Sequence, residues 1–326
     1  MPPPPDLTSY ILPTQTSDDI FKSQILPAEF PSLAPAPQTQ AGQRPLAVLI
    51  VGQTGAGKTR LAPAVLKAQT ALRGSPAHII ADTYKTYHPS YATLTASPAT
   101  APLASPATGP DARRWLRLAA AHAADQRFDL LIESACRHPD DFTALAAALH
   151  DASYRVEVVV LAVPRPLSRL GILTRFHERL PEAGSRGLPV RLTPIKVHDD
   201  SYSGLLYAAQ WIDAHPETVD QVLVVRRGNL VAFSDAKERP DGKLKGQVAA
   251  AIVRERERPL TDVEKNTAAE DLAKLEKRDT ALAQELRAML APLLAEINPS
   301  SLQPLLPLEF PFERCRRDAT LWLGNS

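Results

Sequence analysis

The sequence predicts an α/β protein with a mostly parallel sheet, helices on both faces of that sheet, and a helical C-terminal extension. Short apolar segments alternate with longer segments of helical periodicity between residues 46 and 234. Strands that are apolar along their whole length are typical of parallel sheets covered on both faces. A glycine-rich loop directly follows the first of these segments, and ligands of such sheets bind at the carboxyl ends of the strands.

The apolar segments predict four strands and then a strand pair, at residues 46–51, 78–82, 128–133, 155–164 and 221–234. A turn at Gly228-Asn229 joins the two halves of the last segment. Helical periodicity predicts one helix starting in the glycine-rich loop and others at residues 113–124, 139–152, 167–180 and 194–213. Pro139 and the two aspartates after it suit the first turn of a helix, where the helix dipole favours acids.

Proline is concentrated in three segments of the chain, which has 31 prolines in all. Because proline lacks an amide hydrogen and its ring clashes with the preceding turn, these segments are not expected inside helices. We therefore expect residues 1–45 to form an extended tail, residues 95–110 a long loop, and residues 297–313 a wrapped C-terminal arm. The tail is either disordered or packed on the core through the apolar residues of "YILP" and "EFPSL".

The alternating pattern stops after Ser234. Residues 261–297 have the periodicity of one long helix with an apolar stripe, and such a stripe must pack on something. It can pack on its own domain, cover the active site, or present a surface to a partner protein. These features divide the chain into a tail at 1–45, an α/β domain at 46–234 and an extension at 235–326.

Composition excludes several classes of partner. The formal net charge of +1 gives no reason to expect nucleic acid or an acidic membrane surface. No apolar run approaches the length of a membrane span, and the N-terminus lacks the basic and apolar regions of a signal peptide. The two cysteines provide neither a disulfide framework nor a metal-ligand cluster. We expect a cytoplasmic protein in a reducing compartment.

The loop after the first strand matches the phosphate-binding pattern G-x-x-x-x-G-K-[ST]. Glycine lets the backbone form a nest of N–H groups around phosphate oxygens, and the helix that follows presents its positive end to the same anion. The lysine reaches the β- and γ-phosphates of a nucleoside triphosphate, and the threonine hydroxyl binds Mg²⁺. The residues expected to hold the nucleotide are Gly52, Gln53, Thr54, Gly55, Ala56, Gly57, Lys58 and Thr59.

Two carboxylates end the next two strands. Asp82 can accept a proton from an acceptor hydroxyl or hold a metal-bound water, although an aspartate here can also cap the next helix. Glu133 stands where P-loop proteins keep an acid near Mg²⁺, and Arg137 can point into the same cleft. The alternatives are an N-cap interaction for Glu133 and a surface ion pair for Arg137.

Five motifs in order make residues 46–234 resemble the zeta toxins, the kinase toxins of epsilon/zeta toxin–antitoxin systems. The motifs are the phosphate loop, "ADTYKTYHP", "IESACR", "LAVPRPLSRLGILTRFHE" and "VRLTPIKVHD". The resemblance implies a P-loop kinase fold with ATP and Mg²⁺ as cofactors. It also implies phosphorylation of a sugar hydroxyl of UDP-N-acetylglucosamine, a nucleotide-sugar substrate, and hence a block of cell-wall synthesis.

The resemblance assigns roles residue by residue. Asp82 is the base on the acceptor hydroxyl, and Arg175 and Arg191 clamp the transferred phosphoryl group beside Lys58. The acceptor is held by Asp82, Lys85, Glu133 and Arg137. Control of such a toxin is expected from an antitoxin protein or, in cis, from the long C-terminal helix.

The chain departs from the family pattern on the acceptor side. The family carries an acid in the helix before the third strand, where this chain has Arg117 nearby, and Ser-Ala-Cys replaces Gly-Thr-Gly after Glu133. The proline-rich segment 95–110 lies on the same side. Two alternatives therefore stay open: a metabolic or antibiotic-modifying kinase acting on another small hydroxyl compound, and a non-catalytic, ATP-dependent interaction module.

Overall fold

A computed structural model describes residues 6–30, 44–178, 186–187, 192–237, 242–294 and 304–310. Within these residues a seven-stranded sheet has the order β2-β3-β1-β4-β5-β6-β7. Its strands are β1 (Leu46–Val51), β2 (Ala77–Ile80), β3 (Leu130–Ser134), β4 (Arg155–Leu161), β5 (Gln221–Arg226), β6 (Leu230–Ala236) and β7 (Leu306–Pro307). The first five are parallel, whereas β6 and β7 pair antiparallel to their neighbours.

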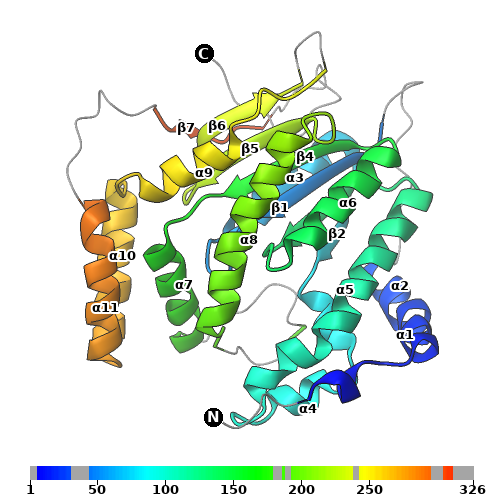
Figure 1. Ribbon diagram of the computed structural model, residues 1–326, viewed down its shortest axis with the longest axis horizontal. Coiled ribbons are helices and arrows are strands. Elements are labelled where there is room, and N and C mark those ends of the chain that lie inside the picture. Colours follow the sequence, from blue (N-terminus) through cyan, green and yellow to red (C-terminus); the bar gives the residue numbers. More distant parts are fainter. Residues whose placement is uncertain are drawn as a thin grey trace.

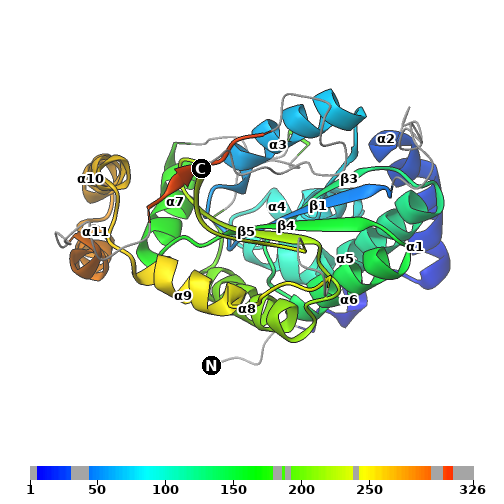
Figure 2. The same ribbon diagram turned by 90° about the horizontal axis from the view of Figure 1, so that it is seen from above.

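Alternate side chains of the central strand β1 enter two different cores, so both faces of the sheet are covered as predicted. Ala47, Leu49 and Val51 pack under the N-terminal helices and α5, α6, α8 and α9. Leu46, Val48 and Ile50 pack under α3, α7, α10 and α11 (Figures 1 and 2). These helices are α3 (Lys58–Arg73), α5 (Ala101–Asp125), α6 (Pro139–Asp151), α7 (Arg165–His177), α8 (Ile195–Ala214), α9 (Val248–Glu257), α10 (Asp262–Glu276) and α11 (Thr280–Leu290).

The described part of the N-terminal segment is helical and packed on the core, so the expectation of an extended tail was wrong for residues 6–30. It forms η1 (Thr8–Tyr10), α1 (Thr14–Ile20), a π-helical turn η2 (Phe21–Ile25) and α2 (Leu26–Glu29). Ile25 is fully buried, and the indole of Trp115 in α5 donates a hydrogen bond to the carbonyl of Ser17. Burial of its apolar face stabilises this segment, which lies beside α5 (Figure 1).

Residues 101–125 form one continuous helix, α5, with Pro106 and Pro110 inside it. The prediction of a loop at 95–110 was therefore wrong. The prediction also missed the short helix before it, α4 (Tyr91–Thr95). Proline has the φ angle of a helix, and its cost comes from the missing N–H and the ring. Pro110 has no amide hydrogen to donate to the carbonyl of Pro106, four residues earlier in the helix. The missing hydrogen bonds and the two rings therefore lie on the same side of the helix. That side faces the cavity described below.

The C-terminal extension contains more elements than predicted. Helix α9 was not expected, and the single helix expected at 261–297 is a hairpin of α10 and α11, followed by a 3-10 turn, η4 (Ala291–Leu294). Helix α10 ends at Glu276, and Asp279 caps α11 by accepting a hydrogen bond from the amide of Leu282 at 2.9 Å. The break lets both apolar faces reach α7, and Leu272, Leu286 and Leu290 are buried there. The apolar stripe thus packs on the chain's own core.

Two further expectations concern the end of the chain and membranes. Of the arm expected at 297–313, residues 304–310 are described, and Leu308 and Phe310 pack against the core beside β7. The rest of that arm lies outside the described residues. Among the helices that the structure describes, none is both long enough and apolar enough to cross a membrane.

Packing of the hairpin can be measured by truncating one of its side chains. Leu286 is 0% exposed, so Leu286→Ala should lower the free energy of unfolding by ~2–5 kcal/mol because it removes buried methyl groups and leaves a cavity. Urea denaturation of the full chain measures this. Val263→Ala on the same hairpin is the control: its side chain is 73% exposed, and the loss should stay within ~0.5 kcal/mol. Equal small losses in both variants would contradict the packing described.

Candidate active site

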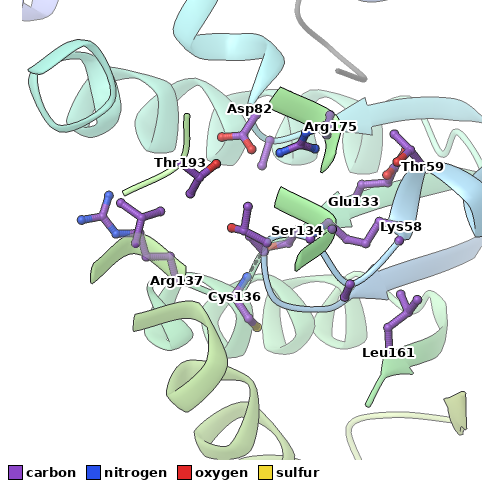
Figure 3. A pocket seen from close by; sticks show the side chains of 18 of the residues that line it. Lys58, Thr59, Asp82, Glu133, Ser134, Cys136, Arg137, Leu161, Arg175 and Thr193 are labelled. Atoms are coloured by element: carbon purple, nitrogen blue, oxygen red, sulfur yellow. Dashed lines mark hydrogen bonds between the residues drawn. The ribbon is translucent and has the colours of Figure 1, made fainter. Parts of the chain in front are cut away.

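A cavity of about 820 Å³ lies at the carboxyl ends of β1, β2 and β3. Parallel strands end at the same edge of a sheet, so the side chains after each strand meet there. Helices α5, α7 and α10 and the turn after β5 complete the walls. The predicted site residues that line it are Thr54, Gly55, Ala56, Gly57, Lys58, Thr59, Asp82, Lys85, Glu133, Arg137 and Arg175 (Figure 3).

Three predicted site residues are not among those that line the cavity. Gly52 and Gln53 are buried beneath the loop, where the Gln53 side chain donates a hydrogen bond to the carbonyl of Val163 at 2.5 Å. Arg191 lies outside the described residues, although Thr193, two positions later, lines the cavity. The side chain of Gln53 therefore braces the loop from below.

The backbone of the phosphate loop takes the conformation for which glycine was expected. Gly55 and Gly57 have φ angles of 80° and 108°, which side chains with a Cβ rarely adopt. Gly57 directly precedes α3, so the first amides of this 16-residue helix point at the loop. Lys58 Nζ donates to the carbonyl of Gly52 at 2.8 Å across the loop.

Close packing against α7 leaves the loop little freedom to change shape. A Cβ on Gly55 would lie 2.1 Å from the carbonyl oxygen of Ser168, and a Cβ on Gly171 would lie 2.9 Å from that of Gly55. The guanidinium of Arg227 closes this contact by donating to the carbonyls of Gly55 and Leu167, each at 2.9 Å. Sequence reasoning missed Arg227, although its place after a buried strand at the binding edge could have indicated it.

Asp82 and Arg175 come from different elements, the start of a 3-10 turn and helix α7, and lie near one another in Figure 3. Asp82 begins the 3-10 turn η3 (Thr83–Tyr87) after β2, and Lys85 donates a short hydrogen bond to its carboxylate. Half of the Asp82 side chain is exposed, so an acceptor hydroxyl has access to it. Arg175 projects from the last turn of α7.

Glu133 is the penultimate residue of β3, lines the cavity and is 4% exposed. Its carboxylate lies 2.9 Å from Nε2 of His78 on the neighbouring strand, an interaction the sequence did not suggest. Cys136, three residues on, is fully enclosed; burial raises the pKa of its thiol to about 12, and nearby Lys58 opposes this. The thiol is therefore protonated at neutral pH and unsuited to nucleophilic chemistry.

The end of the cavity beyond Asp82 carries several basic side chains. Arg137 pairs with Asp200 of α8 at 3.5 Å, and Arg113 of α5 lies 3.0 Å from Nε2 of His138. Burial and then the charges of Arg113 and Arg137 lower the pKa of His138, so the imidazole is neutral at physiological pH. The prediction did not include Arg113 or His138. It considered Arg117, one turn after Arg113, which is not among the lining residues.

A buried chain of hydrogen bonds joins α7 to α8. Ser168 Oγ lies 2.8 Å from Nε2 of His198, and Nδ1 of His198 lies 2.9 Å from Asp199. Because an ionised carboxylate only accepts, Nδ1 donates to Asp199 and Nε2 accepts from Ser168. Neither Ser168 nor His198 lines the cavity. These hydrogen bonds therefore hold α7, and with it Arg175, in position.

Thr59 and Glu133 both line the cavity, and their hydroxyl and carboxylate fit the oxygen preference of Mg²⁺. In the part of the chain that the structure describes, no group of three or more His, Cys, Asp or Glu side chains is placed to hold a metal ion.

Comparisons with known proteins indicate which family this chain is similar to. A family model described as Zeta toxin matches residues 33–238. Toxin zeta of Streptococcus pyogenes is 29% identical over 160 residues, 49% of this chain and 53% of that protein. Toxin zeta of Enterococcus hirae is 28% identical over 166 residues, 51% of this chain and 55% of that protein. The chain thus spans about half the length of the curated relatives it matches.

A solved structure gives the same fold. It comes from the characterisation of the PezAT chromosomal toxin–antitoxin system of Streptococcus pneumoniae and matches with a TM-score of 0.61. The match covers 84% of this chain and 100% of that one at 17% sequence identity. It supports the architecture alone.

The close contact at Gly171 predicts a defect in nucleotide binding. In Gly171→Ala the new methyl group would lie 2.7 Å from the guanidinium of Arg227 and 2.9 Å from the carbonyl of Gly55, so the phosphate loop must shift. We expect affinity for a fluorescent ATP analogue to fall ~10-fold or more, about 1.4 kcal/mol. Gly109→Ala is the control, since its methyl group would meet only Arg113, at 3.9 Å. Unchanged affinity in Gly171→Ala would show that the clamp is not needed.

The buried His198 predicts an acid-sensitive fold. Burial lowers its pKa below 6.5, although the bond to Asp199 opposes this. The unfolded chain then binds the proton more readily, so this group destabilises the fold as the pH falls below 6.5 and has no effect above it. The free energy of unfolding should fall by up to ~1.4 kcal/mol per pH unit from this group. Urea titrations at pH 7.5 and 5.5 measure it, and His198→Asn, which cannot titrate, should show a smaller difference between the two pH values.

Proposed function

Because the chain belongs to the zeta toxin family, we propose that it is an ATP-dependent phosphotransferase acting on a hydroxyl group of a small acceptor. One observation carries this proposal. A single cavity joins the phosphate loop, the Asp82–Lys85 pair and Arg175. The loop would bind the triphosphate, Asp82 would supply a carboxylate for the acceptor, and Arg175 would supply a positive charge between the two. Phosphoryl transfer requires little more than such positioning and charge stabilisation.

The phosphate loop would hold the triphosphate of ATP. Lys58 already lies across the loop on the carbonyl of Gly52, and a β- or γ-phosphate is a stronger acceptor for its ammonium group. Thr59 and Glu133, the latter through water, would hold Mg²⁺ together with the nucleotide. Bound there, the ion would neutralise charge on the phosphate oxygens.

Asp82 would accept the proton of the attacking hydroxyl. Lys85 beside it favours the ionised carboxylate, which is the form that a base requires. Arg175 would stabilise the negative charge of the transferred group, a role in which one arginine accounts for ~10³-fold or more in rate. We propose Arg191 as its second partner.

The acceptor end favours a substrate that carries both phosphate and hydroxyl groups. Arg113, Arg137 and Lys85 supply donors suited to a diphosphate, and Asp82 and Asp141 supply acceptors for hydroxyl groups; all five line the cavity. A nucleotide sugar has this chemistry, and UDP-N-acetylglucosamine is the member that the family implies. Glu133 and Arg137 would organise this acceptor. We propose in addition that a protein antitoxin restrains the activity.

The full chain incubated with ATP, Mg²⁺ and a panel of nucleotide sugars tests the proposal, with mass spectrometry detecting addition of one phosphoryl group. Lys58→Ala, Asp82→Asn and Arg175→Ala should each lower the rate by ~10²-fold or more. Asp140→Asn is the control because this exposed aspartate lies outside the cavity lining. Expression should arrest bacterial growth, and Asp82→Asn should relieve the arrest.

Other outcomes would identify the alternatives. Phosphorylation of an unrelated hydroxyl compound without growth arrest would support a metabolic or antibiotic-modifying kinase. ATP binding with no phosphorylated acceptor in any panel would support an interaction module. Either result would overturn the nucleotide-sugar proposal.

A further inference from the structure

Helix α10 of the C-terminal extension forms one wall of the cavity. Four of its residues line it: Thr267, Glu270, Asp271 and Lys274. Their spacing of three and four residues places them on one helix face. The neighbouring face of the helix carries Ala268, Leu272 and Leu275, which are buried in the core. The helix is thus amphipathic, with its polar face turned to the cavity.

A buried ion pair holds this wall in place. Arg226, fully buried at the end of β5, donates to Glu264 of α10 at 2.7 Å and to the carbonyl of Glu255 at 2.9 Å. Glu264 also forms the capping box of α10 with Thr261. The next residue, Arg227, donates to the phosphate loop at Gly55. Two consecutive residues therefore tie α10 and the phosphate loop to the same strand.

The wall lies at the nucleotide end of the cavity. Helices α10 and α11 lie beside α7, on the side of the molecule away from α5 (Figures 1 and 2). The acceptor residues Arg113 and His138 belong to α5 and the loop before α6. A triphosphate on the loop with its γ-phosphate toward Asp82 would therefore extend its ribose and base past Arg60 toward α10.

Asp271 is the residue best placed to contact a sugar there. It is half-buried, and its neighbours in the cavity are Arg227, Lys274, Thr174 and Arg60. Desolvation raises its pKa and these groups oppose the shift. A carboxylate beside a nucleotide commonly accepts hydrogen bonds from ribose hydroxyls. It is not suited to binding phosphate, because both groups are negatively charged.

We propose that α10 is the ribose-binding wall of the nucleotide site and that Asp271 accepts hydrogen bonds from the ribose hydroxyls of a nucleoside triphosphate. The inference rests on the proposed use of ATP. It makes the extension a part of the binding site that increases affinity. A helix that only covered the site in cis would decrease affinity instead.

Calorimetric titration of the full chain tests the inference with four ligands: ATP, 2′-deoxyATP, 3′-deoxyATP and inorganic tripolyphosphate, each with Mg²⁺. The wild-type chain should bind ATP ~10-fold more tightly than at least one deoxy analogue, about 1.4 kcal/mol. Asp271→Asn should bind ATP ~10-fold more weakly and lose that discrimination. Its affinity for tripolyphosphate, which has no ribose, should be unchanged.

Glu276→Gln provides the matched control, because Glu276 lies on the same helix and pairs with Arg287 of α11 at 3.0 Å, outside the cavity lining. It should bind every ligand as the wild type does. If the wild type binds ATP and both deoxy analogues equally well, the proposed ribose contact is wrong, and the wild-type titrations alone show this. Tighter ATP binding by Asp271→Asn would also overturn it and support a cover in cis. Failure of the wild type to bind ATP and tripolyphosphate would instead overturn the proposed function.

Discussion

The two consecutive arginines at the end of β5 connect the parts of the site. Arg226 reaches into the extension to Glu264, and Arg227 reaches across the edge of the sheet to the carbonyls of Gly55 and Leu167. Arg226 is fully buried and Arg227 is partly buried, and a buried guanidinium without partners is costly. Their hydrogen bonds therefore hold the phosphate loop, α7 and α10 in one arrangement. Loss of either partner set would leave an uncompensated charge at the cavity wall.

The cavity has two ends with different chemistry, and the sheet topology explains why. The central strand β1 delivers the phosphate loop to the middle of the binding edge. On one side, β2 and β3 deliver Asp82 and Glu133 beside α5, and on the other, β5 delivers Arg227 beside α7 and α10. A nearly neutral chain thereby concentrates charge where two anionic ligands would meet.

The local sequence pattern was sufficient to predict the strands. It failed to predict segments whose structure depends on contacts with residues far away in the sequence. The apolar runs and the glycine loop predicted β1 to β6 because burial on two faces leaves an unmistakable composition. The helix through Pro106 and Pro110 was missed because its stability comes from packing of the opposite face, including the fully buried Trp115. The N-terminal helices were missed for the same reason. The break at Asp279 had a local signal, a good N-cap residue, that the long apolar periodicity obscured.

The sequence by itself determined the phosphate loop, the strand alternation and the positions of Asp82, Lys85 and Glu133, because each follows from residue types adjacent in the chain. Only the tertiary structure decided that Gln53 braces the loop from below, that Arg113 and His138 line the same cavity as Asp82, and that α10 forms a wall of the cavity. The physical reason is that these contacts join segments tens to hundreds of residues apart. No local periodicity records which face of one helix will meet another.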